Sequence, residues 1–229
     1  MHHIQKDIIS SLAHTAPQRF SELQPPQIPN NTFSYHLKRL LQAGYVQLTD
    51  KGYVATRKAL KALQYTANHD KRMNNPVFIT AIFVTNNNGD VLLLRRNNQP
   101  FVGWYGIPAG LIHQGEPLDE AARRELREKA SIKNARPQFA GVLDFRYKES
   151  ATDDLFVHTI AFIYSYRLPT SGKQLAGFSS RYGTLLWSEL NDPRILPEVH
   201  DMAKIARKAD GSLVSIDYKE PTKLVWAED

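Results

Sequence analysis

Apolar residues in the first third of the chain recur every three or four positions in three separate stretches. This spacing is typical of helices with one buried face. It predicts helices over residues 4–14, 20–23 and 31–43, the last capped by one of the two adjacent asparagines at its start. The Pro-Pro-Gln-Ile-Pro stretch at 25–29 cannot continue a helix and predicts a turn. The chain therefore begins with three short helices.

The pattern changes after the third helix to short β-rich segments. Residues 45–48 and 53–56 are predicted strands, and the Asp-Lys-Gly sequence at 50–52 can turn the chain tightly enough for a hairpin. A fourth helix is predicted over residues 57–64. Three helices followed by a β-hairpin is the order of elements in a winged helix-turn-helix.

Residues 33–46, Phe-Ser-Tyr-His-Leu-Lys-Arg-Leu-Leu-Gln-Ala-Gly-Tyr-Val, resemble the recognition helix and wing of bacterial winged-helix regulators. The resemblance implies contact with double-stranded DNA, although some winged helices bind proteins instead. The candidate DNA-binding residues are Asn31, Thr32, Ser34, Tyr35, Lys38 and Arg39 on the helix and Lys51 on the wing. Lys38 and Arg39 are expected to contact phosphates rather than bases.

The net positive charge of the chain lies in this first third. Residues 1–72 contain ten Lys and Arg against four Asp and Glu, whereas residues 73–229 contain nineteen of each. The formal net charge of +6 therefore belongs to the first third alone. This asymmetry favours a polyanionic partner for that part of the chain, with a solvated basic surface as the alternative.

A polar stretch without periodicity follows the fourth helix. We expect a winged helix-turn-helix domain over residues 1–66, a linker over 67–76 and a second domain over 77–229. The second domain has a formal charge near zero, so the two domains are expected to have different partners.

The second domain begins with the pattern of two strands and continues to an amphipathic helix. Residues 78–85 and 91–95 are predicted strands joined by an asparagine-rich turn. A helix is predicted over residues 117–130, and Glu125 and Glu128 project together from its polar side. Its apolar stripe comprises Leu118, Ala121, Ala122, Leu126 and Ala130.

The segment around this helix is similar to the Nudix box. In that pattern a Gly is followed after five residues by Glu and, after seven more, by Arg-Glu-apolar-x-Glu-Glu-x-Gly-apolar. The residues that the chain supplies in register are Gly110, Glu116, Arg124, Glu125, Leu126, Glu128 and Ile132. The likeness spans roughly residues 77–207. It implies an α/β (α+β) fold, a Nudix-type α/β/α sandwich with a mixed sheet, behind the small winged helix-turn-helix domain.

The resemblance also implies a chemistry, the hydrolysis of a nucleoside diphosphate linked to another group. Mg²⁺ held by carboxylates and a backbone carbonyl neutralises phosphate oxygens and activates water. By position, the Ala109 carbonyl, Glu125 and Glu128 would hold the metal, and the two glutamates would be the catalytic residues. Glu116 would pair with Arg124 and stabilise the structure.

Two positions depart from the box. Lys129 stands where the second glutamate of the Glu-Glu pair is expected, and Ser131 replaces the glycine. In the family, the residue at position 129 holds the metal together with Glu125. A unit charge at about 4 Å is worth on the order of 4 kcal/mol at an effective dielectric of about 20. Mg²⁺ binding is therefore expected to be weak, and Lys129 can pair with Glu125 instead.

Cationic and aromatic residues near the box can hold a diphosphate without a metal. Arg95, Arg124 and Trp104 are the candidate ligand-binding residues, with Arg96 and Lys129 as further cations. An arginine can pair with a phosphate through two hydrogen bonds, and Trp104 can stack on a base or ribose. A position in the core is the commoner role for such an aromatic residue.

Three functions are compatible with these patterns. The first is a DNA-binding transcription regulator whose Nudix-like domain binds a nucleoside-diphosphate-linked metabolite, such as an ADP-ribose-like compound, with weak or no hydrolysis. It is similar in concept to Nudix-related regulators of NAD metabolism, which pair the two modules in the opposite order. The second is an active Mg²⁺-dependent nucleoside diphosphate-X diphosphatase with an accessory nucleic-acid-binding domain. The third is a protein-interaction module without either activity.

The whole-chain composition sets the remaining expectations. There is no cysteine, so disulfides and thiolate metal sites are excluded. There is neither a secretory signal nor an apolar run of membrane-spanning length, so a cytoplasmic location is expected. A homodimer is expected because winged-helix regulators commonly bind two half-sites. Residues 212–229 alternate in polarity as an extra strand or a dimer contact would, and the sequence leaves both open.

Overall fold

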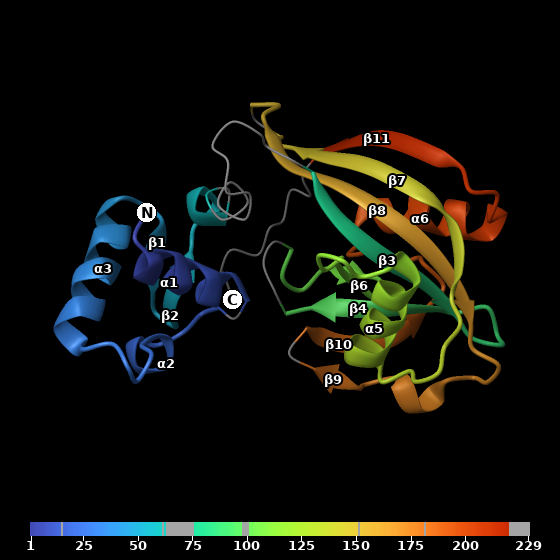
Figure 1. The fold of residues 1–229 in the computed structure, drawn as a ribbon, viewed down its shortest axis with the longest axis horizontal. Helices are drawn as coiled ribbons and strands as arrows, with labels where there is room; N and C mark the ends of the chain where they lie inside the picture. The colour runs from blue at the N-terminus through green and yellow to red at the C-terminus, as the bar shows by residue number, and fades with distance from the viewer. Residues whose placement is uncertain are drawn as a thin grey trace. The chain divides into compact units, whose positions relative to one another are not determined.

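Figure 1 shows the fold in a computed structural model of the chain. The structure describes residues 1–14, 16–60, 62, 76–97, 101–150, 152–180 and 182–219. These residues form two compact units, one within residues 1–62 and one formed by residues 76–96 and 103–219. Most of the predicted linker, residues 67–75, lies outside the described residues.

The first unit contains helices and a two-stranded antiparallel sheet in the order that the apolar spacing predicts. Its elements are α1 (His3–His14), α2 (Phe20–Leu23), α3 (Asn30–Gln42), β1 (Val46–Thr49) and β2 (Gly52–Ala55). Thr49 pairs with Gly52, so Asp50 and Lys51 form the hairpin turn. A further helix begins at residues 57–60, and the predicted continuation to residue 64 is largely outside the described residues. This is the order of a winged helix-turn-helix.

One apolar core holds the first unit together. Its members include Ile8, Ile9 and Leu12 from α1, Phe33, Leu37 and Leu40 from α3, and Val46 and Ala55 from the hairpin. The prediction of an asparagine cap for α3 is wrong, because Pro29 occupies the cap position and no side chain caps the helix. The Asn31 side chain instead accepts a hydrogen bond from the amide of Thr32 (2.8 Å).

The second unit is built on one mixed sheet, which has nine strands among the described residues. The strands are β3 (Val77–Thr85), β4 (Val91–Arg96), β5 (Tyr105–Gly106), β6 (Ala109–Leu111), β7 (Gln138–Lys148), β8 (Leu155–Arg167), β9 (Ser179–Ser180), β10 (Gly183–Ser188) and β11 (Leu213–Lys219). The main order is β11-β7-β8-β3-β4-β10-β9, with β5 beside β4 and β6 beside β3. The pairs β3–β8 and β11–β7 are parallel and the others antiparallel.

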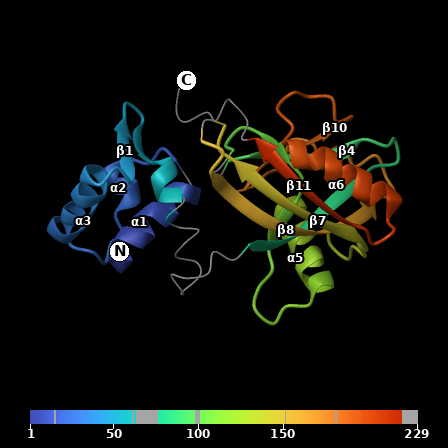
Figure 2. The ribbon, with the colours of Figure 1, turned by 90° about the horizontal axis from the view of Figure 1, so that it is seen from above.

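Helices α5 (Leu118–Ala130) and α6 (Pro197–Lys208) cover opposite faces of this sheet (Figure 2). On β3, Ile82 and Val84 belong to the core on the α5 side. Phe83 between them lies 5.8 Å from the Arg207 guanidinium of α6. Successive residues of a strand point to opposite faces, so the two helices are on different sides. The predicted α/β/α sandwich with a mixed sheet is confirmed.

Three details extend or correct the predicted elements. β3 and β4 pair only at Thr85 and Val91, because residues 79–81 of β3 pair with β6 instead, while β8 pairs along the other edge of β3. Two helices were not predicted, namely α6 and the short 3-10 helix η1 (Lys173–Leu175). Residues 213–219 form an extra strand beside β7, while residues 220–229 lie outside the described part. None of the helices described is long and apolar enough to span a membrane.

Candidate functional sites

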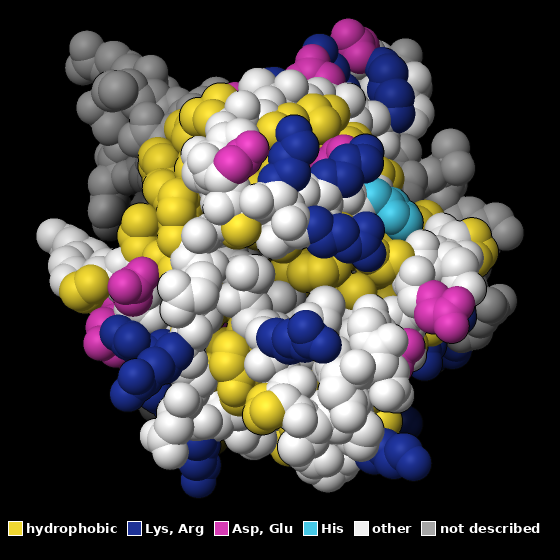
Figure 3. Space-filling view, turned by 90° about the vertical axis from the view of Figure 1, so that its right-hand side faces the viewer, with side chains coloured by type: hydrophobic (Ala, Val, Ile, Leu, Met, Phe, Trp, Pro, Cys, Tyr) yellow, Lys and Arg dark blue, Asp and Glu magenta, His cyan; other side chains and the backbone are white. Residues whose placement is uncertain are grey.

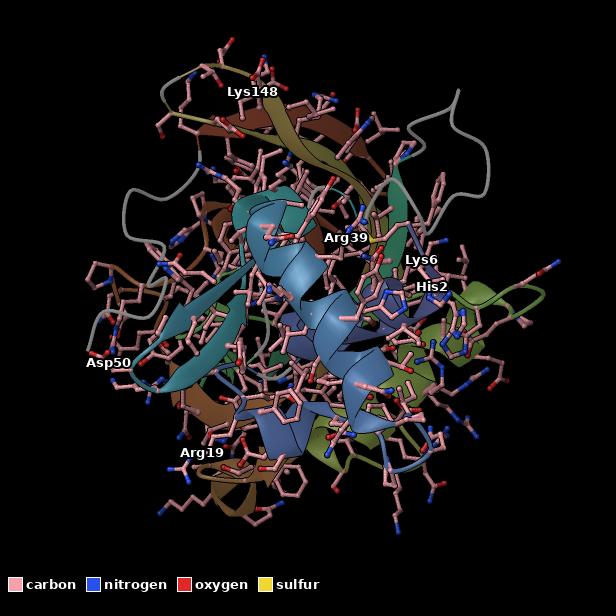
Figure 4. The ribbon with its side chains drawn as sticks, turned by 90° about the vertical axis from the view of Figure 1, so that its left-hand side faces the viewer. His2, Lys6, Arg19, Arg39, Asp50 and Lys148 are labelled. Atoms are coloured by element: carbon pink, nitrogen blue, oxygen red, sulfur yellow. The ribbon has the colours of Figure 1, made fainter. Side chains whose placement is uncertain are left out.

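The residues predicted to contact DNA gather on the solvent side of α3, which Figure 4 views directly. Ser34, Tyr35, Lys38 and Arg39 are exposed, because the apolar residues of this helix are turned into the core. Arg39 Nη1 donates to the Tyr35 hydroxyl over 3.4 Å. The helix therefore presents two cations and two hydroxyls to solvent.

The remaining predicted DNA contacts flank this face. Asn31 is exposed and Thr32 half-buried at the start of α3. Lys51 is exposed in the hairpin turn, next to Asp50, whose label in Figure 4 marks the tip. In contrast, the face of the second unit in Figure 3 carries basic and acidic side chains interspersed, as expected from equal numbers of each in residues 73–229.

A second candidate site surrounds the Glu125 carboxylate on α5. Glu125 is only 3% exposed. Its carboxylate lies against Gly110 of β6, where an added Cβ would fall far inside van der Waals contact of the carboxylate atoms. A glycine is therefore needed at position 110 for Glu125 to reach this place, which gives the box glycine a steric role.

Both oxygens of Glu125 face cations of the protein itself. Arg124 Nη1 donates to Oε1, and Lys129 Nζ lies 2.8 Å from Oε2. Lys129 is 9% exposed, and its ammonium lies 4.9 Å from the centre of the Tyr182 ring. Burial lowers the pKa of Lys129, and the nearby Glu125 carboxylate opposes this effect. The expected pair of Glu125 and Lys129 is thus present and buried.

Glu116 and Arg124 form the predicted structural pair. Arg124 Nε and Nη2 donate to the two Glu116 oxygens at 2.8 Å each, and Nη2 also donates to the Leu111 carbonyl at 2.9 Å. The hydrogen bonds from Arg124 lower the pKa of Glu116 to about 2. The pair therefore stabilises the fold above pH 4.5, the ordinary pKa of the carboxyl, and is lost as the pH falls towards 2. Every nitrogen of Arg124 already donates to a protein acceptor.

Glu128 and Ala109 are the other residues predicted to hold a metal. The Glu128 side chain is 38% exposed, lies 4.0 Å from Arg124 Nη1 and accepts a hydrogen bond from the Tyr182 hydroxyl (3.4 Å). Ala109 pairs with Ala81 in the sheet and precedes the glycine that contacts Glu125. Glu125, which lies between the cationic groups of Arg124 and Lys129, does not fit the role of a Mg²⁺ ligand. No three acidic or histidine side chains in the described residues are arranged to hold a metal ion.

The predicted ligand-binding residues of β4 and the following loop are not all brought to this carboxylate. Arg95 is exposed on β4, and Trp104 is half-buried. The adjacent Arg96 points to the other face of the strand and is half-buried. Burial is the main cause of the lowered pKa of Lys129, and the charge of Arg96 adds to it, so Arg96 is the β4 arginine whose charge reaches this site.

A buried polar cluster adjoins Arg96 and was not predicted. The Tyr147 hydroxyl donates to the Glu198 carboxylate in the first turn of α6, and both residues are buried. Burial raises the pKa of Glu198, and Arg96 opposes this shift. The aromatic residues Tyr105, Phe145 and Tyr147 are also buried in the core. The cluster joins residues about fifty or more positions apart, which no local pattern indicates.

The second unit is an α/β/α sandwich in which Glu125 of helix α5 packs against Gly110 of strand β6. This is the architecture of a Nudix-type domain. The family model described as NUDIX domain matches residues 76–208, more than half of the chain, and the chain belongs to this family. The "Uncharacterized Nudix hydrolase YvcI" of Bacillus subtilis (strain 168) is 32% identical over 110 residues, or 47% of this chain and 63% of that protein. The match thus spans less than two thirds of that relative.

Two solved structures show similarity to the same fold. The bifunctional NMN adenylyltransferase/ADP ribose pyrophosphatase of Francisella tularensis, complexed with AMP and a Mn ion, is 15% identical with a TM-score of 0.50. That similarity covers 76% of this chain and 52% of the other. The NUDIX domain of Shewanella oneidensis NrtR complexed with ADP ribose is 19% identical with a TM-score of 0.47, over 63% of this chain and 96% of the other.

Proposed function

We propose that this protein is a cytoplasmic DNA-binding transcription regulator whose NUDIX domain binds a nucleoside-diphosphate-linked metabolite with weak or no hydrolysis. The winged helix contacts double-stranded DNA through the exposed side of α3 and the hairpin turn. The NUDIX domain reports the presence of the metabolite. This function requires that the ligand favours one arrangement of the two units, because a ligand without such a preference shifts nothing.

The ion pair between Glu125 and Lys129 is the observation that carries this proposal. An ammonium 2.8 Å from Oε2 occupies the place where a metal-binding carboxylate is expected. Two like unit charges about 4 Å apart repel by on the order of 4 kcal/mol at an effective dielectric of about 20, and the repulsion between an ammonium and a dication is about twice that. The phosphates of a ligand would therefore meet Lys129 and Arg96 rather than Mg²⁺, with Arg95 and Trp104 as further contacts. Arg124 holds Glu116 and Glu125 in place.

Titration of the wild-type protein with nucleotides tests this function. ADP-ribose, a nucleoside diphosphate joined to a second group, is the first probe, followed by NADH, dinucleoside polyphosphates and nucleoside triphosphates. We expect calorimetric binding of at least one probe in EDTA and little release of product when Mg²⁺ is added. Brisk Mg²⁺-dependent turnover of any probe would instead establish the hydrolase.

The exposure of Glu128 supports that second candidate, an active diphosphatase with an accessory nucleic-acid-binding domain. Glu128 lies one turn from Arg124 at 4.0 Å and keeps 38% of its side chain exposed, so one box carboxylate remains accessible to a cation. Its neighbour Glu125 is the residue that Lys129 neutralises. The hydrolase therefore requires a metal held with fewer carboxylates than the box provides.

A lysine variant on α3 tests DNA binding. Lys38→Ala is expected to weaken double-stranded DNA binding about equally for all sequences, because a lysine on a phosphate reads charge and not bases. The slope of log affinity against log salt should become shallower by about 1, since one fewer counterion is released. Fluorescence anisotropy at several salt concentrations measures both quantities in the full chain.

The matched control for this experiment is Lys204→Ala. Lys204 lies on α6 of the second unit, and 72% of its side chain is exposed. Its loss should leave the salt slope unchanged. An equal effect of both variants, or a flat salt response of the wild type, contradicts DNA binding by α3. Two half-sites per operator would bring two copies of the chain together, so the complex is expected to contain a homodimer.

A further inference from the structure

Three histidine rings lie in contact at the junction of α1 and α3. The His2 ring stacks on the His36 ring with 4.3 Å between centroids and 19° between planes. The His2 ring also contacts the His3 ring, with 4.3 Å between the two centroids. His36 belongs to α3, whereas His2 and His3 lie at the start of α1. The cluster thus joins the first helix to the helix proposed to contact DNA.

His36 is held in a place that disfavours a positive charge. It is 9% exposed, and its Nδ1 atom is buried without a hydrogen-bond partner. The Tyr35 ring meets it edge-on at 5.2 Å. The titratable or charged groups that act on it are His2 and His3 from the α1 side and Arg39 from its own helix. None of these groups is a carboxylate, so a proton on His36 would lack a counter-charge.

We propose that the cluster of His2, His3 and His36 is a proton-binding switch that loosens the packing of α1 against α3 when the solution becomes acidic. A proton on His36 places a positive charge in the stack with His2 and beside the Arg39 guanidinium, in a buried position without a counter-charge. This cost falls when the start of α1 moves away from α3, because the His36 ring then gains access to water. The stacked contact between the two helices is then lost, while the core residues further along both helices still hold the unit together.

The direction of the pH effect follows from the environment of His36. Burial, and then the charges of His2, His3 and Arg39, lower its pKa below the ordinary value of 6.5. The unfolded chain therefore takes up the proton more readily than the folded unit does. The first unit keeps its full stability above pH 6.5 and loses stability as the pH falls below it.

This inference bears on regulation only through the proposed function. Tyr35 and Arg39 flank His36 on α3 and belong to the face proposed to contact DNA. A loosened α3 would hold these side chains less firmly, and operator binding should weaken in acid. The proton switch itself is a property of the first unit, and it can be measured without DNA.

The experiment follows the amide signals of α1 and α3 by NMR in the full chain. From about pH 7.5 to about pH 5.5, a range that spans histidine titration, the melting temperature reported by these signals should fall by about 5 °C or more. His36→Phe keeps a ring that can stack on His2 and takes no proton, so its fall should be much smaller. His36→Gln, which is also uncharged, provides a second test if the phenylalanine does not fit.

His200→Gln is the matched control, because His200 is an exposed histidine on α6 of the second unit. It should retain the wild-type fall. Equal falls in the wild type and both His36 variants overturn the proposal, as does a wild type whose α1 and α3 signals are insensitive to pH. A normal pH response without DNA binding at any pH supports the switch and counts against the proposed function alone.

Discussion

Replacing Lys129 by glutamate is expected to turn the NUDIX domain into a Mg²⁺-dependent hydrolase of nucleoside-diphosphate-linked compounds. The substitution removes the ammonium that lies 2.8 Å from the Glu125 carboxylate and supplies a second carboxylate in its place. Two buried carboxylates repel each other unless a cation lies between them. The variant therefore has space for a dication between the two carboxylates, and a dication bound there relieves their repulsion.

The expected gain in turnover is about 100-fold or more, which corresponds to about 2.7 kcal/mol of transition-state stabilisation. Release of product from ADP-ribose and the other probes measures it. Thermal melting provides an independent readout, because an ion that binds only the folded state raises the melting temperature. Mg²⁺ should raise the melting temperature of Lys129→Glu in comparison with EDTA and leave that of the wild type nearly unchanged.

Lys129→Gln separates the two effects of the substitution. It removes the positive charge without adding a carboxylate, so it should gain neither turnover nor a melting response to Mg²⁺. If Lys129→Gln becomes as active as Lys129→Glu, the ammonium alone was blocking an otherwise complete metal site. If the wild type is already active, the proposal of a ligand-binding regulator fails.

Local sequence patterns were sufficient for the elements that lie close together in the chain. The helical spacing of apolar residues predicted α1 and α3 to within one residue, and the box predicted α5 and the pairing of Glu116 with Arg124. Ser131 departs from the box in its residue type, but with a φ of 52° it keeps the left-handed backbone that ends α5. Glycine is favoured in that conformation, so the replacement of the box glycine by Ser131 changes the side chain but not the backbone geometry.

Contacts between distant segments could not be predicted in the same way. Tyr182 reaches Lys129 and Glu128 from the turn before β10, and Tyr147 of β7 donates to Glu198 of α6. The alternation at 213–219 left open whether the segment adds a strand or forms a dimer contact, because a strand pattern does not name its partner. Pairing with β7 shows that residues 213–219 add a strand to the sheet.

The same limit applies to the electrostatics of the site. The sequence places Lys129 one turn from Glu125, and on an exposed helix face such a pair contributes only about 0.2–0.5 kcal/mol. The structure buries both residues, so each charge depends on the other for compensation. Lys129 is therefore linked through Glu125 to the packing of α5 on β6, and its neighbours should be sensitive to substitution.

The sharpest test of this coupling is Gly110→Ala, which should lower the free energy of unfolding of the NUDIX domain by about 2–4 kcal/mol. An added methyl group at this position collides with the Glu125 carboxylate. The carboxylate ends a flexible side chain and can move, but moving it breaks the ion pairs with Arg124 and Lys129. A buried ammonium without its partner is the main source of the cost.

Gly106→Ala is the matched control, because a Cβ there would be 3.9 Å from Leu196 Cδ1, an ordinary contact. Urea unfolding followed by tryptophan fluorescence, in a Trp226→Phe background so that only Trp104 and Trp187 emit, reports on the second unit in both variants. Equal stabilities for the two variants would show that Glu125 leaves its place without cost. In the Lys129→Glu background, Gly110→Ala should also abolish the gained turnover while Gly106→Ala preserves it, since only the former displaces the carboxylate that the metal needs.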